Sequence, residues 1–119
     1  MASFTSTFIG GRGAVYAGTK GYDQWFSLAL GDELKENVDV LTVQPGLVAT
    51  PMTSKYSKNV KAVSPKEHVE GALKYLGRER YAYGARSHAF QGLLINFIPW
   101  RFMTRAREAV NNKLHGAAK

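Results

Sequence analysis

Apolar residues recur at helical spacing in the first third of the chain, at Val15, Tyr22, Trp25, Phe26, Ala29, Leu30 and Leu34. This period of about 3.6 residues predicts a helix over residues 14 to 36. The next segment, Val38 to Val43, is short, rich in valine and nearly all apolar, and it is followed by Pro45-Gly46. That pattern predicts a buried strand of the kind found in parallel sheets.

Residues 47 to 63 follow without a clean period, and they predict a long loop of the kind that is often functional. A second helix is expected to begin at Ser64-Pro65-Lys66-Glu67, which combines an N-cap serine, a proline at the first helical position and a glutamate at the third. Its expected buried stripe is Val69, Ala72, Leu73 and Leu76, and Gly77 is its expected stop.

The last third predicts a short strand at residues 81 to 84, an apolar segment at 89 to 100 that Pro99 interrupts, and a basic helix over 101 to 114. Helices that alternate with strands predict an α/β fold. Two short strands are too few for a doubly wound parallel sheet, because sheets average about five or six strands. The sequence therefore predicts only part of such a sheet.

Composition narrows the class of protein. With 119 residues the chain is one domain or part of one, and 45% hydrophobic residues are too many for a disordered chain. The absence of cysteine excludes disulfides, thiolate metal sites and a cysteine nucleophile. We expect no metal site, because three scattered histidines make a poor zinc site and His68 and His115 are expected on the surface. His88 is expected to be a hydrogen-bonded structural residue.

Charge is unevenly distributed along the chain. Residues 1 to 53 have 3 basic and 5 acidic residues, whereas residues 54 to 119 have 13 and 4. This asymmetry suggests an anionic partner, although a solvated basic face is an equal alternative. Aromatic residues lie beside arginines within 89 to 114, which suits a segment at the level of lipid headgroups or packing against a partner helix. No recognition motif indicates nucleic acid.

The candidate chemistry begins with Tyr16 and Lys20, whose i, i+4 spacing puts both side chains on one face of the first helix. An ammonium beside a phenol favours the phenolate, which can exchange a proton with a carbonyl or an alcohol. Such a pair arises by chance about as often as not in a chain of this composition, so its context decides.

That context is Pro45-Gly46-Leu47-Val48-Ala49-Thr50, directly after the predicted strand. In open α/β sheets ligands bind outside the carboxyl ends of the strands, so this turn is placed to touch a cofactor. Taken alone, such a segment is more often a plain turn that ends a strand.

In this order, the tyrosine and lysine, the long helix, the strand and the Pro-Gly turn resemble the C-terminal half of a short-chain dehydrogenase/reductase. The tail, with Ser64-Pro65, Tyr83-Gly84, Ser87 to Gln91 and Pro99, is most similar to the membrane-associated 3-ketoacyl-CoA reductase and 17β-hydroxysteroid dehydrogenase branch. The resemblance covers residues 13 to about 110. It implies a catalytic helix, strand and turn over 1 to 53, and a substrate loop and basic C-terminal region over 54 to 119.

The resemblance also implies roles for single residues. Tyr16 would be the catalytic acid and base, and Lys20 would hold the nicotinamide ribose and favour the phenolate. Thr50 and the backbone of Pro45, Gly46 and Val48 would line the nicotinamide site. Ser3 lies thirteen residues before Tyr16, at the spacing of the serine that stabilises the substrate oxygen. The equal alternative is that residues 1 to 4 follow that serine, which then lies upstream of this sequence, and Ser6 is a poorer candidate.

The family's glycine-rich pyrophosphate turn has no counterpart, because Gly10-Gly11-Arg12-Gly13 follows Ser3 and no strand precedes it. The sequence is therefore expected to be the C-terminal part of a Rossmann-like sheet, inactive alone. The expected activity is interconversion of a lipid-like ketone, a 3-ketoacyl-CoA or keto-steroid, and its alcohol. The resemblance implies NADP(H), with NAD(H) still open, a homodimer, and the cytosolic face of the endoplasmic reticulum or the cytoplasm. The rival interpretation is a non-enzymatic basic module that binds a membrane surface or a partner protein.

Overall fold

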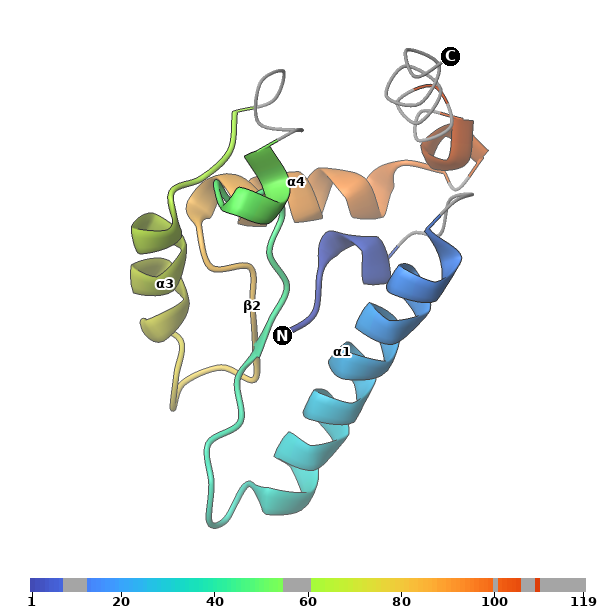
Figure 1. Ribbon diagram of the computed structural model, residues 1–119. Helices are drawn as coiled ribbons and strands as arrows, with labels where there is room; N and C mark the ends of the chain where they lie inside the picture. Colours follow the sequence, from blue (N-terminus) through green and yellow to red (C-terminus); the bar gives the residue numbers. More distant parts are fainter. Residues whose placement is uncertain (8–12, 55–60, 100, 106–108, 110–119) are drawn as a thin grey trace.

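Two short parallel strands lie at the centre of the structure, between helices (Figure 1). The computed structural model describes residues 1–7, 13–54, 61–99, 101–105 and 109. Its elements are η1 (Phe4–Ser6), α1 (Ala14–Leu34), β1 (Thr42–Val43), η2 (Pro51–Thr53), α3 (Pro65–Leu73), β2 (Tyr81–Ala82) and α4 (Arg86–Phe97).

The strands pair in parallel register, with Thr42 opposite Tyr81 and Val43 opposite Ala82. Parallel neighbours need a crossover connection, and α3 lies within it. Figure 1 shows α1 and α3 on opposite sides of the strands and α4 across their carboxyl ends. The predicted α/β class is therefore confirmed, with helix following strand in the expected order.

The first residues of the chain run beside β1. The Ala2 N–H donates to the Val43 carbonyl at 2.8 Å, and the Phe4 N–H donates to the Pro45 carbonyl at 3.0 Å. Because β2 bonds to Thr42 and Gln44, these carbonyls point the other way. Residues 2 to 4 thus extend the hydrogen bonding on the side of β1 that faces α1.

Helix α1 matches the predicted range, but its large apolar side chains face outward. Its buried residues are Ala17 and Gly31, whereas Val15, Tyr22, Trp25 and Phe26 are exposed. The strand predicted over Val38 to Val43 is confirmed only at Thr42–Val43, and Val38 is 51% exposed. It is shorter because β2 offers a ladder partner at Tyr81 and Ala82 alone.

Helix α3 begins as predicted and ends earlier. The Ser64 hydroxyl accepts a hydrogen bond from the Glu67 N–H at 3.1 Å, which caps the helix. The helix stops at Leu73 instead of Gly77, and Gly77 lies in the following turn with a φ of 74°. The prediction for its buried stripe is right for Ala72 and wrong for its larger members, because Val69, Leu73 and Leu76 are all exposed.

The buried side of α3 carries small residues because another backbone approaches it. A Cβ added to Gly71 would lie 2.3 Å from the Gly84 carbonyl oxygen, so only glycine fits there. Gly84 itself has a φ of 79°, and its Cα faces the His68 ring. His68, expected on the surface, is therefore buried at 7% exposure, and that expectation is wrong.

The predicted apolar segment is helix α4, which ends at Phe97 just before Pro99. Residues 101–105 are also helical, and most of the rest of the predicted basic helix lies outside the described residues. So do residues 8–12 and 55–60, which hold parts of two predicted loops, and His115. Within the described part of the chain, none of the helices is long and apolar enough to span a membrane.

The contact between α3 and the Gly84 turn predicts opposite outcomes for two glycine-to-alanine substitutions. Gly71→Ala should destabilise the fold by about 1–3 kcal/mol, because its Cβ would meet backbone that cannot move aside. Gly18→Ala, in α1, has no atom within 4 Å of the new Cβ and should stabilise by about 0.5–1 kcal/mol. Urea midpoints measure both, and equal shifts in the same direction would contradict the packing described.

Candidate active site

Tyr16 and Lys20 lie in the first two turns of α1, on one face of the helix. The Lys20 ammonium is 6.0 Å from the centre of the Tyr16 ring, at the outer limit of a cation–π contact. Tyr16 is 46% exposed, and its hydroxyl has no hydrogen-bond partner among the described residues. The phenol is therefore accessible to a ligand.

Lys20 is held in place by two oxygen atoms. Its ammonium donates to the Asp23 carboxylate at 2.7 Å and to the Met1 carbonyl at 3.1 Å. The hydrogen bond from Lys20 holds the pKa of the Asp23 carboxyl below its ordinary value. The lysine thus joins the start of α1 to the segment that carries Ser3.

Ser3 lies at the carboxyl end of β1, between the hydrogen bonds of Ala2 and Phe4 to that strand. Its hydroxyl accepts from the Thr5 N–H at 3.3 Å and caps η1. Its carbonyl accepts from the Ser6 hydroxyl at 2.6 Å. Ser6, the alternative candidate, also hydrogen-bonds Gln24 and Gln44, so its hydroxyl is more committed to the protein than that of Ser3.

Gln44 organises this corner and was missed by sequence reasoning. Its side chain is 1% exposed, and its amide nitrogen lies within hydrogen-bond distance of four oxygen atoms, in Ser3, Ser6, Thr7 and Gln24. A polar residue at the end of an apolar strand was the available signal, since a buried amide needs partners. Gln44 ties the residues around Ser3 to both β1 and α1.

Gly46 is packed from both sides. An added Cβ would lie 2.8 Å from the His88 ring and 2.9 Å from the Phe4 ring, so the turn accepts no larger residue. The His88 Nε2 also lies 3.2 Å from the Leu47 carbonyl oxygen. His88 is 1% exposed, which confirms the expected structural histidine with a hydrogen bond.

Val48 and Thr50 extend this turn away from the sheet. Val48 forms an isolated parallel bridge with Val63, and the Thr53 hydroxyl donates to its carbonyl. Among the described residues, the Val48 N–H meets no acceptor. The Thr50 hydroxyl lies 3.1 Å from that of Thr53, in a capping box that begins η2. These groups offer one free N–H and a fixed hydroxyl beside the end of β1.

The structure thus brings the predicted residues to one end of the strands. Ser3 and Gly46 both pack against β1 or its continuation, and Lys20 reaches Met1 in the same segment. Within the described residues, no hydrogen bond joins Tyr16 to Ser3 or Thr50.

This donor set fits the edge of a nicotinamide and its ribose. The Val48 N–H would donate a hydrogen bond to the nicotinamide carboxamide, and the Lys20 ammonium would donate to the ribose hydroxyls. The close packing of Gly46 against the His88 and Phe4 rings fixes the turn that carries the Val48 N–H. A metal is a poorer match, because the described residues contain no group of three or more metal-ligating side chains.

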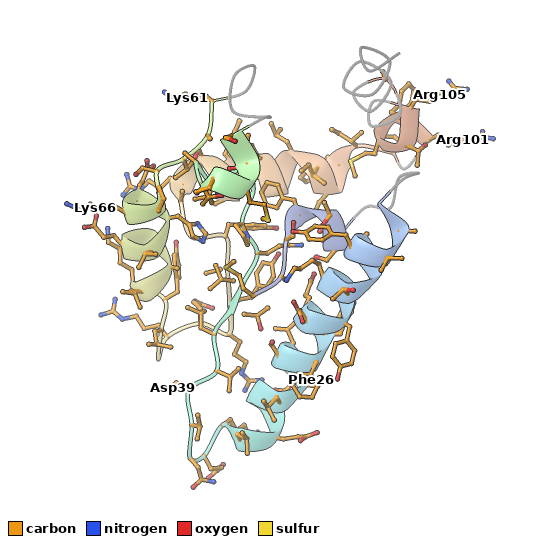
Figure 2. All side chains as sticks on the ribbon, in the orientation of Figure 1. Phe26, Asp39, Lys61, Lys66, Arg101 and Arg105 are labelled. Atoms are coloured by element: carbon orange, nitrogen blue, oxygen red, sulfur yellow. The ribbon has the colours of Figure 1, made fainter. Side chains whose placement is uncertain are left out.

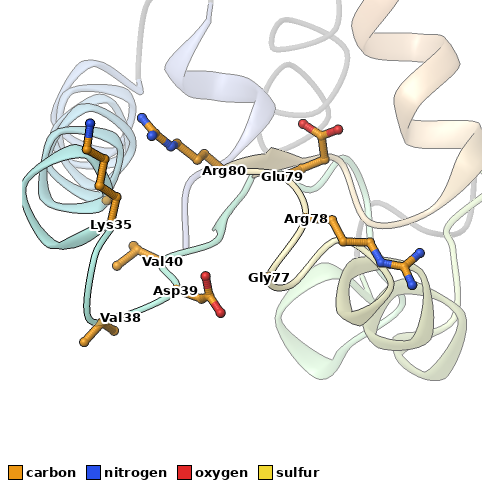
Figure 3. Close-up of a pocket in the computed structure, with 9 residues that line it drawn as sticks. Lys35, Val38, Asp39, Val40, Gly77, Arg78, Glu79 and Arg80 are labelled. Carbon is orange, nitrogen blue, oxygen red and sulfur yellow. The ribbon is translucent and has the colours of Figure 1, made fainter.

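A pocket of about 180 Å³ lies elsewhere, at the amino-terminal end of the strands (Figure 3). Its lining residues are Gly31, Lys35, Val38, Asp39, Val40, Gly77, Arg78, Glu79 and Arg80. Lys35 and Val38 to Val40 precede β1, whereas Pro45 to Thr50 follow it, so this pocket is not part of the candidate site.

The chain is similar in sequence to curated reductases and dehydrogenases. The chain is 37% identical over 91 residues to a very-long-chain 3-oxoacyl-CoA reductase of Phaeosphaeria nodorum, covering 76% of this chain and 26% of that protein. It is 30% identical over 91 residues to the Homo sapiens protein of the same name, covering 75% and 29%. It is 30% identical over 86 residues to 17-beta-hydroxysteroid dehydrogenase type 3 of Danio rerio, covering 71% and 28%.

The chain is homologous to the short-chain dehydrogenases/reductases. The resemblance inferred from Tyr16, Lys20 and the Pro-Gly turn is thereby confirmed, as is kinship with oxidoreductases. No family model matches the chain. The chain spans about a quarter of the length of these curated relatives.

A solved structure supports the fold. The chain superposes on a structure from a study of 7beta-hydroxysteroid dehydrogenase stereoselectivity with a TM-score of 0.65 and 22% identity, covering 76% of this chain and 36% of that one. The α/β arrangement is thus part of a Rossmann-like fold, as the sequence predicts.

The ion pair between Lys20 and Asp23 predicts a shifted titration. The Asp23 carboxyl should titrate below 3.8, so the pair persists above that pH and is lost as the pH falls through the lowered value. In Lys20→Met the pKa should return toward 3.8, because the principal cause of the shift is gone. Carboxyl ¹³C shifts measure this; Lys35→Met is the control, and an unchanged titration in Lys20→Met would refute the pairing.

Proposed function

We propose that the chain carries the acid–base half of an NADP(H)-dependent reductase that interconverts a lipid-like ketone and its alcohol. The carrying observation is the accessible side chain of Tyr16, whose ring centre lies 6.0 Å from the Lys20 ammonium, while Lys20 itself bonds to the segment that carries Ser3. Relatives named as 3-oxoacyl-CoA reductases and a hydroxysteroid dehydrogenase support a 3-ketoacyl-CoA or keto-steroid as the substrate.

Each residue has a distinct part in this proposal. Bound nicotinamide would supply the hydride to the carbonyl carbon. The Tyr16 hydroxyl would donate its proton to the carbonyl oxygen, and the Ser3 hydroxyl would stabilise the charge that develops on that oxygen. Lys20 would hold the ribose and favour the phenolate left on Tyr16. Backbone of Pro45, Gly46 and Val48, together with the Thr50 hydroxyl, would hold the nicotinamide.

The division of the chain is part of the same proposal. Residues 1–53 would form the catalytic helix, strand and turn, and residues 54–119 the substrate loop and the basic C-terminal region. The pyrophosphate would bind to a glycine-rich turn outside this sequence. The phosphorylated cofactor is preferred here on the resemblance to the reductase branch, and NAD(H) is the alternative.

Activity is best tested in a hybrid protein, because the chain matches about a quarter of its relatives. The aligned segment of the Phaeosphaeria nodorum reductase would be replaced by that of this chain, and NADPH oxidation followed with a 3-oxoacyl-CoA. Tyr16→Phe should lower kcat by about 10²–10⁴-fold, because it removes the transferred proton. Tyr22→Phe, on the same helix and equally able to lose a hydroxyl, should change kcat less than about twofold. Equal losses in both would refute the role of Tyr16.

A membrane partner is supported by the outer face of α4. Phe90, Leu93, Leu94 and Phe97 recur at helical spacing and are all about half exposed or more. Arg86 precedes this stripe, and Arg101 and Arg105 follow it, pointing away from the molecule (Figure 2). No acidic residue occurs from 81 to 107. A second copy would oppose arginine to arginine, whereas an anionic bilayer neutralises both ends of the stripe.

We therefore propose that the α4 stripe rests on an anionic lipid surface, such as the cytosolic face of the endoplasmic reticulum. The chain should sediment with vesicles of phosphatidylserine and phosphatidylcholine, and each of Arg101→Gln and Arg105→Gln should weaken binding about fivefold at low salt. Lys35→Gln, at the far end of α1, is the matched control, and Tyr16→Phe should have no effect. Binding that ignores salt and both arginines, or dimerisation through α4, would contradict this.

The expected homodimer stays a prediction of the same resemblance. Its contact would be the outer face of α1, where the Tyr22 and Phe26 rings stack at 5.5 Å with Trp25 beside them. Figure 2 shows Phe26 on the outer side of this helix. Aromatic groups exposed to this extent are typical of surfaces that another part of a protein covers.

A further inference from the structure

The Pro-Gly turn is held from outside the sheet by a buried imidazole. His88 lies in the first turn of α4, and its Nε2 is 3.2 Å from the Leu47 carbonyl oxygen. Because a carbonyl oxygen only accepts, the Nε2 atom must carry the proton. This bond joins α4 to the turn across 41 residues of sequence.

The ring also packs on the turn. Its Cδ2 and Nε2 atoms would lie 2.8 and 3.0 Å from a Cβ at Gly46, and the Phe4 ring meets the imidazole edge-to-face at 5.8 Å. The carbonyl of Leu47 is thus fixed on one side of the peptide that links Leu47 to Val48. Since the Val48 N–H belongs to that same planar peptide, its direction is fixed as well.

We propose that His88 is a positioning residue for the nicotinamide site: it orients the Leu47–Val48 peptide so that the Val48 N–H points toward the cofactor. This inference rests on the proposed function for the identity of the ligand. The orientation rests on the contacts of His88 with Leu47 and Gly46, which act together with a second donor to the Leu47 carbonyl, the Val63 N–H at 3.0 Å.

The His88 imidazole holds the Leu47 carbonyl in its neutral form. Burial lowers the pKa of His88, and burial likewise lowers that of His68, whose ring centre is 5.8 Å away. The Glu67 carboxylate on α3 and the backbone of Leu47 and Tyr83 act in the opposite direction, but burial is the largest influence on the pKa of His88. Near pH 7 the ring therefore has one N–H, and the Leu47 carbonyl fixes it at Nε2.

The test follows the peptide itself by NMR in the full 119-residue chain, labelled with ¹³C and ¹⁵N. His88→Leu should shift the Leu47 carbonyl and Val48 amide signals, because the donor is removed while the ring volume is largely filled. His88→Gln places an amide N–H near the Nε2 position and should restore both signals. His68→Leu is the control, since His68 is also buried and no hydrogen bond joins it to Leu47 in the described structure.

Titration with NADPH completes the experiment, and it is done in the hybrid protein of the activity test, because the pyrophosphate would bind outside this sequence. The unsubstituted hybrid and its His88→Gln variant should show Val48 amide shifts at similar NADPH concentrations, and His88→Leu should need about tenfold more. Unchanged Leu47 and Val48 signals in His88→Leu, or equal changes in His68→Leu, would overturn the positioning role. A hybrid that keeps the His88-dependent Leu47 signal but never responds to NADPH would instead overturn the cofactor assignment. If His88→Leu fails to fold, the unsubstituted chain provides the test. The ¹³C shift of the Leu47 carbonyl should then change as His88 is titrated with acid, and an unchanged shift would overturn the inference.

Discussion

The structure depends on glycines at which another backbone or a ring approaches more closely than a Cβ atom allows. Gly71 meets the Gly84 carbonyl, Gly92 meets the Tyr83 ring, and Gly46 meets His88. Through these contacts α3 packs beside the strands, α4 lies across their carboxyl ends, and the Pro-Gly turn is fixed against His88. The candidate site owes its geometry to this packing more than to the two-residue strands, whose ladder is too short to orient anything alone.

Close approach at glycines also decides where the large side chains go. The buried residues of the described structure are mainly alanines, a valine, a threonine, a glutamine and two histidines. Large apolar side chains such as Trp25, Phe90 and Phe97 consequently lie on the outer faces of α1 and α4. A fold arranged this way has surface to be covered, which agrees with a chain that spans about a quarter of its relatives.

The features of the fold that depend on neighbouring residues could be predicted from the sequence. The α1 period, the Ser64 cap and the order of helices and strands were right because each depends on neighbouring residues. The buried stripe of α3 and the surface position of His68 were wrong, because the partner of that helix is a glycine turn about thirteen residues away. Gln44 was overlooked for the same reason: its partners come from residues 3 to 24, and no spacing rule connects them.

The three candidate side chains of the site, Ser3, Tyr16 and Lys20, differ in how firmly hydrogen bonds hold them. Lys20 is held by Asp23 and the Met1 carbonyl, and Ser3 by the cap of η1, whereas the Tyr16 hydroxyl has no partner among the described residues. A group that orients a ligand works best when its own position is fixed, since little conformational entropy is then lost on binding. A group that transfers a proton must instead be able to reach the reacting oxygen. This difference supports the proposed roles of Tyr16 in proton transfer and of Lys20 in holding the ribose, and the proposed role of His88 extends the same logic to the backbone of the turn.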